Sequence, residues 1–228
     1  SSSLKYQLFD WEKKEVVAIG IVERIGIEGS FIKHEVPAKD KEIKTETSIP
    51  DHKVGIKLVL EALVKGEGAV IANMSEISAV GHRVVHGGEK FNHSVLINDK
   101  VIAAIKDVSN LAPLHNPANL IGIEAAIDAL PGCPQVAIFD TAFHQTMPAY
   151  AYMYPVPHEW YDKFAVRRYG FHGTSHLYVS KRAADLLGKS AKDCNIITMH
   201  IGNGVSCTAI RGGVSVDTSM GLTPLEGA

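Results

Sequence analysis

Five side chains that can bind anions or exchange protons stand beside turns or at the end of an apolar segment. They are Arg83, His115, Asp140, His172 and His200. An arginine at a strand end can hold a carboxylate or a phosphate through two parallel hydrogen bonds. Singly, each has an ordinary structural explanation: an ion pair for the arginine, a capping or buried hydrogen bond for a histidine. Together, these residue types beside glycine and Asn-Pro turns predict the lining of a polar cleft.

Two segments have the features of phosphate-binding loops, although neither is a Walker loop or a G-x-G-x-x-G loop. The first, Ser1-Ser2-Ser3-Leu4-Lys5, offers hydroxyl groups, closely spaced amides and a cation. The second, Gly202-Asn203-Gly204, lets the backbone approach an anion without an intervening Cβ. For either loop alone an ordinary hairpin turn is the better explanation. A faint likeness between the segments that start at Ser3 and Ser206 would fit a phosphate clamp formed by two loops.

Histidines four residues apart raise a zinc site as an alternative. The pairs are His82 with His86 and His172 with His176. This spacing suits zinc when both histidines lie on one helix, but the first pair falls in an expected strand and turn, and Gly173 interrupts the second. We therefore expect no zinc site. Ser175 beside these histidines resembles a hydrolase nucleophile, yet it lacks the G-x-S-x-G turn.

The composition is typical of a globular protein with a sizeable core. The 228 residues are 46% hydrophobic and 21% charged, with a net charge of −2. This balance indicates no nucleic-acid partner, and apolar runs such as Val16 to Val22 are too short to cross a bilayer. Three widely spaced cysteines predict reduced thiols and a cytoplasmic location. Because the chain starts without methionine and stops in a Gly/Pro-rich loop, we expect a fragment.

The pattern of apolar residues predicts alternating strands and helices, and hence an α/β fold. We expect a charged loop over 39–46 and a domain junction near Asp140, after which 141–169 shows no clean periodicity. The expected strands are 5–10, 15–23, 31–36, 77–85, 134–139, 196–199, 205–210 and 214–217. The expected helices are 50–64, 99–109, 116–130 and 175–187.

Seven segments, in order along the chain, resemble the motifs of the acetate kinase family. They are SSSLKY (1–6), GHRVVHGG (81–88), APLHNP (112–117), FDTAFH (139–144), YGFHGTSH (169–176), HIGNG (200–204) and DTSMG (217–221). The resemblance covers the whole chain but little more than half of a full family member. It implies two ribonuclease-H-like domains of the sugar kinase, Hsp70 and actin group with a central cleft, here 1–141 and 142–228, the second incomplete.

The resemblance also implies a role for each matching residue. Arg83 would hold the substrate, His172 would stabilise the phosphoryl group in transit, and Asp140 would be the catalytic acidic residue. A small apolar pocket with His115 beside it would receive the substrate methyl; its residues would be Val85, Leu114, Phe171 and Pro224. The ATP phosphates would lie near Ser1, Ser3, Lys5, His200, Ile201, Gly202, Asn203 and Gly204.

The implied activity is reversible transfer of the ATP γ-phosphoryl group to acetate, which gives acetyl phosphate and ADP, in a cytoplasmic homodimer. Magnesium would take part, but its ligands would lie outside these residues, so the chain alone is expected to be inactive. Propionate is the alternative substrate, and Val85 favours acetate because valine narrows the pocket. Two other classes remain open: a non-catalytic nucleotide-binding protein, which would not need Arg83 and His172, and a zinc hydrolase, which would need bound metal.

Overall fold

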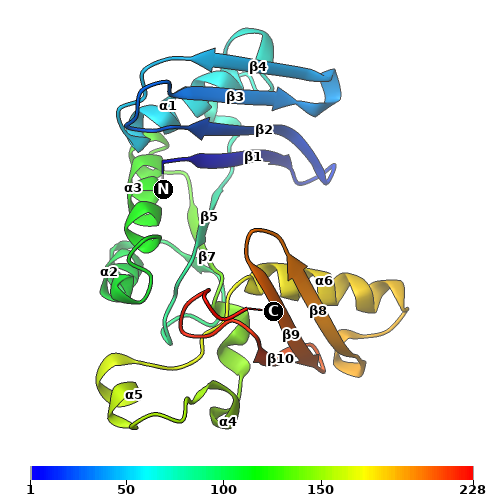
Figure 1. Ribbon diagram of the computed structural model, residues 1–228. Coiled ribbons are helices and arrows are strands. Elements are labelled where there is room, and N and C mark those ends of the chain that lie inside the picture. Colours follow the sequence, from blue (N-terminus) through cyan, green and yellow to red (C-terminus); the bar gives the residue numbers. More distant parts are fainter. Residues whose placement is uncertain (1, 228) are drawn as a thin grey trace. The chain divides into compact units, whose positions relative to one another are not determined.

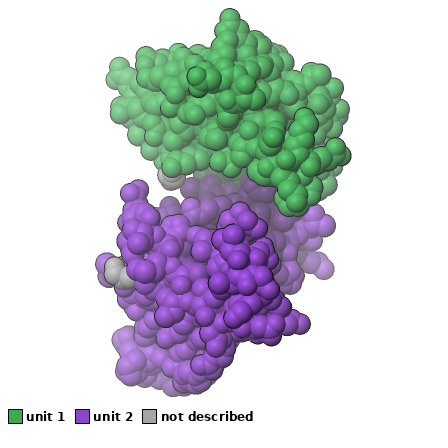
Figure 2. Space-filling view, turned by 90° about the vertical axis from the view of Figure 1, so that its right-hand side faces the viewer, with its two compact units in different colours: residues 1–80, 120–135 green, residues 81–119, 136–228 purple. Residues whose placement is uncertain are grey.

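The computed structural model describes residues 2–227 and shows a mixture of helices and strands, which confirms the α/β class (Figure 1). The chain forms two compact units. The first comprises the chain up to Val80 together with Leu120–Gln135, and the second comprises Gly81–Asn119 and the chain from Val136 onwards (Figure 2). A domain boundary at residue 141 is a different division and stays a prediction.

The first unit contains a four-stranded antiparallel sheet in sequential order. Its strands are β1 (Leu4–Asp10), β2 (Glu15–Glu23), β3 (Phe31–Val36) and β4 (Lys41–Glu46). Our expectation of a charged loop at 39–46 was wrong. Most of this segment forms β4, which pairs with β3 at the edge of the sheet. Its charges suit an edge strand, and Lys33 on β3 forms ion pairs with Glu35 at 3.0 Å and with Glu42 on β4 at 2.8 Å.

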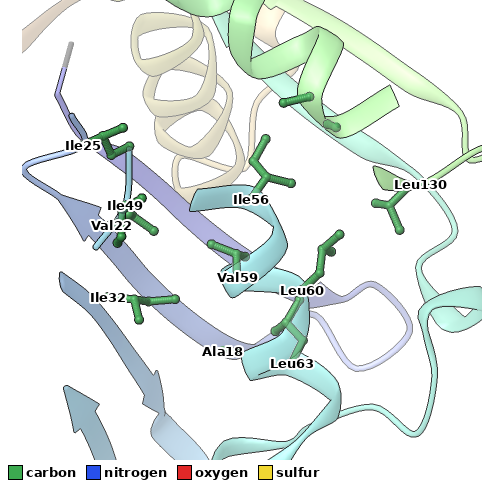
Figure 3. Close-up of a cluster of buried hydrophobic side chains, with 12 residues drawn as sticks. Ala18, Val22, Ile25, Ile32, Ile49, Ile56, Val59, Leu60, Leu63 and Leu130 are labelled. Carbon is green, nitrogen blue, oxygen red and sulfur yellow. The ribbon is translucent and has the colours of Figure 1, made fainter. Parts of the chain in front are cut away.

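One face of this sheet is covered by α1 (His52–Val64) and by the end of α3 (Asn116–Ala129). The Asp51 carboxylate accepts the Val54 N–H at 2.9 Å and so caps the start of α1. Figure 3 shows the labelled side chains of α1 within a cluster that also includes residues of the sheet and Leu130. The buried apolar cluster consists of Ala18, Val22, Ile25, Ile32, Ile49, Ile56, Val59, Leu60, Leu63, Ala125, Ala126 and Leu130.

A small three-stranded sheet has the order β5-β7-β6. Its strands are β5 (Val80–Val84), β6 (Val95–Leu96) and β7 (Gln135–Phe139), and α2 (Asp99–Asp107) follows β6 along the chain. The strand expected from residue 77 starts later, because Met74–Glu76 forms a 3₁₀ turn capped by Asn73. Within the second unit, β5 and β7 end side by side, since the Asp140 N–H donates to the Val84 carbonyl at 3.0 Å.

The later part of the second unit begins with short helices, in the stretch where the sequence shows no clean periodicity. They are a 3₁₀ segment (Ala142–Thr146), α4 (Ala149–Tyr152) and α5 (Glu159–Phe164). The longer α6 (Gly173–Leu186) then packs against an antiparallel sheet of order β10-β9-β8 (Figure 1). Its strands are β8 (Asn195–Ile201), β9 (Val205–Arg211) and β10 (Val214–Thr218). Across residues 2–227, no helix is both long enough and apolar enough to cross a membrane.

Candidate active site

Arg83 and Asp140 form a two-pronged ion pair in the second unit. Arg83 Nε donates to Asp140 Oδ1 at 2.9 Å, and Nη2 donates to Oδ2 at 2.6 Å. The two side chains differ sharply in exposure, 69% for Arg83 and 4% for Asp140. Asp140 raises the pKa of Arg83 through these hydrogen bonds. A buried carboxylate therefore fixes one edge of the guanidinium and leaves its opposite edge open to solvent for an anionic ligand.

The backbone around Asp140 explains how the pair is placed. Arg83 lies on β5 and Asp140 follows β7, so the adjacent ends of these strands bring the two together. The Asp140 carbonyl also accepts the Gly173 N–H at 2.9 Å, and a Cβ at position 173 would lie 2.4 Å from that oxygen. Only glycine allows this approach. The start of α6 is thereby held against the strand end that carries Asp140.

His172 precedes α6 and lies beside the expected second phosphate loop. Its backbone is left-handed, with φ 58° and ψ 20°, an uncommon conformation for a residue with a side chain. Its ring stacks on that of His200 at 4.0 Å between centroids. Gly204 also lies close to the His172 ring, since a Cβ placed at position 204 would be 3.0 Å from His172 Cε1. His172, His200 and the Gly202–Gly204 turn thus lie close together.

His172 is neutral at physiological pH in this setting. Burial is the largest cause that lowers its pKa, and His200 and Arg83 lower it further, whereas Asp140 opposes them. Arg83 and Asp140 thus lie near enough to the imidazole to affect its pKa. A neutral imidazole can still donate one N–H to an anion.

Behind His172 lies a group of buried polar residues that the sequence analysis did not assign to the site. Ser206 Oγ lies 2.8 Å from His172 Nδ1 and 2.8 Å from His176 Nε2. His176 lies on α6, which begins at Gly173, two residues before the expected helix start, while His172 precedes the helix. Alternation along β9, which turns Ser206 and Thr208 inward, was the signal available in the sequence.

His144 is fixed in the same interior. Its Nε2–H donates to the Phe171 carbonyl at 2.9 Å, and its Nδ1 therefore accepts from Ser215 Oγ, also at 2.9 Å. Burial lowers the pKa of His144 to about 4. Burial likewise lowers the pKa values of His86 and His176 to about 4 each. The second unit therefore holds three neutral histidines away from water.

Because these three histidines have lowered pKa values, we expect the folded state to lose stability on mild acidification. Their pKa values are lower in the folded protein, about 4, than the roughly 6.5 of an unfolded chain. The unfolded state thus binds more protons between these values, and the free energy of unfolding falls as pH drops from about 6.5 to about 4. Each histidine contributes up to about 3 kcal/mol to this loss.

Urea unfolding between pH 7.5 and pH 5 measures this effect. The matched variant His144→Gln, whose amide can replace both hydrogen bonds of the imidazole, should show a shallower dependence on pH. Equal stability of the unmodified protein at pH 7.5 and pH 5 would contradict the assignment of neutral buried histidines.

The residues of the expected apolar pocket differ in exposure. Phe171 is buried and packs edge-on against His86 at 5.8 Å between ring centroids. Val85 is half-buried, and its N–H donates to Asn119 Oδ1 at 3.1 Å. Leu114 is 80% exposed, and His115 and Pro224 are exposed as well. A methyl pocket formed by Val85, Leu114, Phe171 and Pro224, with His115 nearby, stays a prediction.

The two expected phosphate loops belong to different units. Lys5 is exposed on β1 of the first unit, and Ser3 directly precedes that strand. Ser1 lies outside the described residues. The Gly202–Gly204 turn, which joins β8 to β9 in the second unit, is closed by a bond of 3.1 Å from the Gly202 N–H to the Gly204 carbonyl, and Ile201 before it is exposed. Phosphate binding by these loops stays a prediction.

Within the part of the chain that the structure describes, no group of three or more His, Cys, Asp or Glu residues could hold a metal ion. His82 and His86 lie on β5 and in the turn after it, where side chains four positions apart do not converge. No chemical step is assigned to a metal below.

The full length of the chain, residues 1–228, matches the model of the acetokinase family. This chain belongs to the acetokinase family. It is 71% identical over 228 residues to an acetate kinase of Geobacter metallireducens and 68% identical to one of Geobacter sulfurreducens. In both cases all of this chain is covered but only 54% of the relative, so the chain spans about half the length of the curated relatives it matches.

Solved structures of the family agree with the fold. The crystal structure of Porphyromonas gingivalis acetate kinase matches with a TM-score of 0.96 and 49% identity, and covers 100% of this chain and 57% of that one. A propionate kinase from Francisella tularensis matches with a TM-score of 0.90 and 42% identity, over 99% of this chain and 56% of that one. The family and the α/β fold inferred from the seven motifs are thereby confirmed.

Proposed function

We propose that the protein to which this chain belongs transfers the γ-phosphoryl group of ATP to acetate, reversibly, to give acetyl phosphate and ADP. The observation that carries the proposal is the Arg83–Asp140 fork beside the neutral His172. Membership in the acetokinase family and 71% identity to an acetate kinase support the choice of reaction.

The open edge of Arg83 would hold the carboxylate of acetate. Acetate is ionised at neutral pH, so the reaction needs no base to deprotonate it. Asp140 is buried and fully engaged with Arg83; its charge is compensated, and its role is to orient the guanidinium. An unpaired carboxylate at this position would repel the anionic substrate.

Phosphoryl transfer depends on in-line alignment of the reacting atoms and on hydrogen-bond donors around the phosphoryl group. A carboxylate oxygen of acetate attacks the γ-phosphorus in line with the bond to the β–γ bridging oxygen. That bond breaks as the new one forms, and ADP leaves with the electron pair. His172 would donate an N–H to a phosphoryl oxygen, and Arg83 would compensate the charge that gathers on the phosphoryl oxygens.

The finer parts of the proposal come from the family resemblance. The ATP phosphates would lie near Ser3, Lys5 and the His200–Gly204 segment. Magnesium would accompany the nucleotide, held by ligands outside this chain. The protein would act as a cytoplasmic homodimer without a nucleic-acid partner. Val85, Leu114, Phe171 and Pro224 would surround the methyl group, with His115 in a supporting role.

Trapping acetyl phosphate tests the proposal. The enzyme of full family length is incubated with ATP, magnesium and acetate, and hydroxylamine converts any acyl phosphate into a coloured hydroxamate. We expect a product that requires both ATP and acetate. Absence of product with acetate and with propionate, from protein that is folded and binds ATP, would refute it.

Propionate is the second candidate substrate, since a solved propionate kinase matches this fold. We expect Val85→Ala to raise the ratio of kcat/KM for propionate over acetate roughly tenfold, because one added methylene is worth about 1–3 kcal/mol in a fitted pocket. Steady-state kinetics with both acids measure the ratio. Val179→Ala, at an exposed valine on α6, is the matched control and should leave it unchanged; an unchanged ratio in Val85→Ala would remove Val85 from the pocket.

A further inference from the structure

A chain of hydrogen bonds runs inward from His172 to Thr198. Ser206 Oγ links His172 Nδ1 to His176 Nε2 at 2.8 Å on each side, and His176 Nδ1 lies 2.7 Å from Thr198 Oγ1. The inner members are buried, with 0% exposure for Ser206, 1% for His176 and 4% for Thr198. The chain joins β8, β9 and α6, so its geometry is set by packing of regular elements.

Each proton in this chain needs an acceptor, and this decides the direction of the bonds. Within residues 2–227, His176 Nδ1 is the one hydrogen-bond partner of the Thr198 hydroxyl. A buried hydroxyl proton without an acceptor is unfavourable. Thr198 therefore donates to His176 Nδ1, which must be the unprotonated nitrogen of that ring.

The rest of the chain follows from this first bond. His176 carries its proton on Nε2 and donates it to Ser206 Oγ. The Ser206 hydroxyl then donates to His172 Nδ1. A neutral His172 with an accepting Nδ1 carries its proton on Nε2, the nitrogen that does not face Ser206. If all these bonds ran in the opposite direction, His172 Nε2 would be unprotonated. The hydroxyl proton of Thr198 would then have no acceptor.

We propose that Thr198, His176 and Ser206 are positioning residues that hold His172 as the Nε2–H tautomer, ready to donate a hydrogen bond to an anionic group. The inference deepens the proposed function, because it supplies the donor that His172 needs toward the phosphoryl group. A lone pair at the same nitrogen would repel phosphoryl oxygens. The three residues act through His172 and do not touch the substrate.

The charges around His172 are consistent with a neutral ring. Its ring faces His200 in a stack, and Arg83 and Asp140 act on it from the strand ends. His176 faces His144 at 5.8 Å between ring centroids, and burial keeps both of these histidines neutral at physiological pH. His172 can therefore keep its tautomer without any gain or loss of protons by the hydrogen-bonded side chains.

The tautomers can be read directly by NMR. Long-range ¹H–¹⁵N spectra of the ¹⁵N-labelled protein at pH 7.5 distinguish Nε2–H from Nδ1–H rings. We expect Nε2–H for both His172 and His176. In Thr198→Val, which keeps the shape of threonine but removes the hydroxyl, we expect the unprotonated Nδ1 of His176 to change its ¹⁵N shift, because it no longer accepts a hydrogen bond. An Nδ1–H tautomer of His172 in the unmodified protein would overturn the proposal.

Kinetics of the enzyme of full family length separate positioning from a merely structural role. We expect Ser206→Ala to lower kcat about tenfold, less than the loss of a whole donor, and to leave the KM for acetate nearly unchanged. Ser206→Thr retains a hydroxyl and should recover most of kcat. The matched control is Thr208→Val, which removes a buried hydroxyl on the same strand, bonded to Thr218 rather than to His176.

The outcomes keep the two proposals apart. If Ser206→Ala and Thr208→Val have equal kcat values, the positioning role is wrong while the kinase proposal stands. If the enzyme phosphorylates neither acetate nor propionate, the proposed function fails, and the NMR spectra still decide the tautomers.

Discussion

Arg83→Ala is expected to lower kcat/KM for acetate by about 10³-fold or more, the effect of an arginine that acts on a transferring phosphoryl group. The guanidinium is expected to bind the carboxylate with its open edge, while Asp140 holds the opposite edge. The substitution also leaves a buried carboxylate without its partner. A loss of about 1–3 kcal/mol in the free energy of unfolding should accompany it.

Two controls make the result interpretable. Arg83→Lys keeps a charge but cannot form the fork, so activity should fall between those of Arg83→Ala and the unmodified enzyme. Arg182→Ala removes an exposed arginine from α6, where it pairs with Asp185 at 3.3 Å, and should change neither activity nor stability. Steady-state kinetics and urea unfolding provide both readouts. Near-normal turnover by folded Arg83→Ala would remove Arg83 from the site.

His172→Asn is the second change with a large expected effect. Asparagine tolerates the left-handed backbone that His172 adopts, so the start of α6 should keep its shape. Its shorter side chain cannot reach where the imidazole Nε2 lies. Loss of a preorganised donor costs about 10²–10³-fold in kcat, and we expect this fall with little change in the KM for acetate.

The control for this variant is His93→Asn, at an exposed histidine in the same unit, which should behave like the unmodified enzyme. Thermal unfolding should show that both variants are folded. A rise in the KM for acetate at unchanged kcat would place His172 in substrate binding rather than in transfer.

The sequence predicted most elements of the fold, because their apolar residues follow regular periods. The alternation in Glu15–Glu23 and the capped pattern that begins at Asp51 both match the structure. The strand β4 was missed because its charged side chains resemble a solvated loop, although it forms a hairpin with the preceding strand β3. The short helices between residues 142 and 164 have too few turns for a period to show.

Some residues of the candidate site could likewise be identified from the sequence, and others could not. Residues beside glycine turns, such as His172 and His200, could be found because turns mark where a chain exposes functional side chains. Asp140 was recognisable at the end of an apolar run. Thr198, Ser206 and His176 were not assigned to the site, since alternation along β9 can turn Ser206 inward but does not show which side chains it meets. Only the register of β8 with β9 and the packing of α6 place these three together.

The position of acetate in the enzyme tests the central claim most directly. A crystal structure of the enzyme of full family length with acetate, MgADP and aluminium fluoride, a mimic of the phosphoryl group in transit, would locate it. We expect the acetate carboxylate on the open edge of Arg83, its methyl group against Val85, and His172 Nε2 within hydrogen-bond distance of a fluoride. Acetate bound away from Arg83, with the mimic out of reach of His172, would contradict the account.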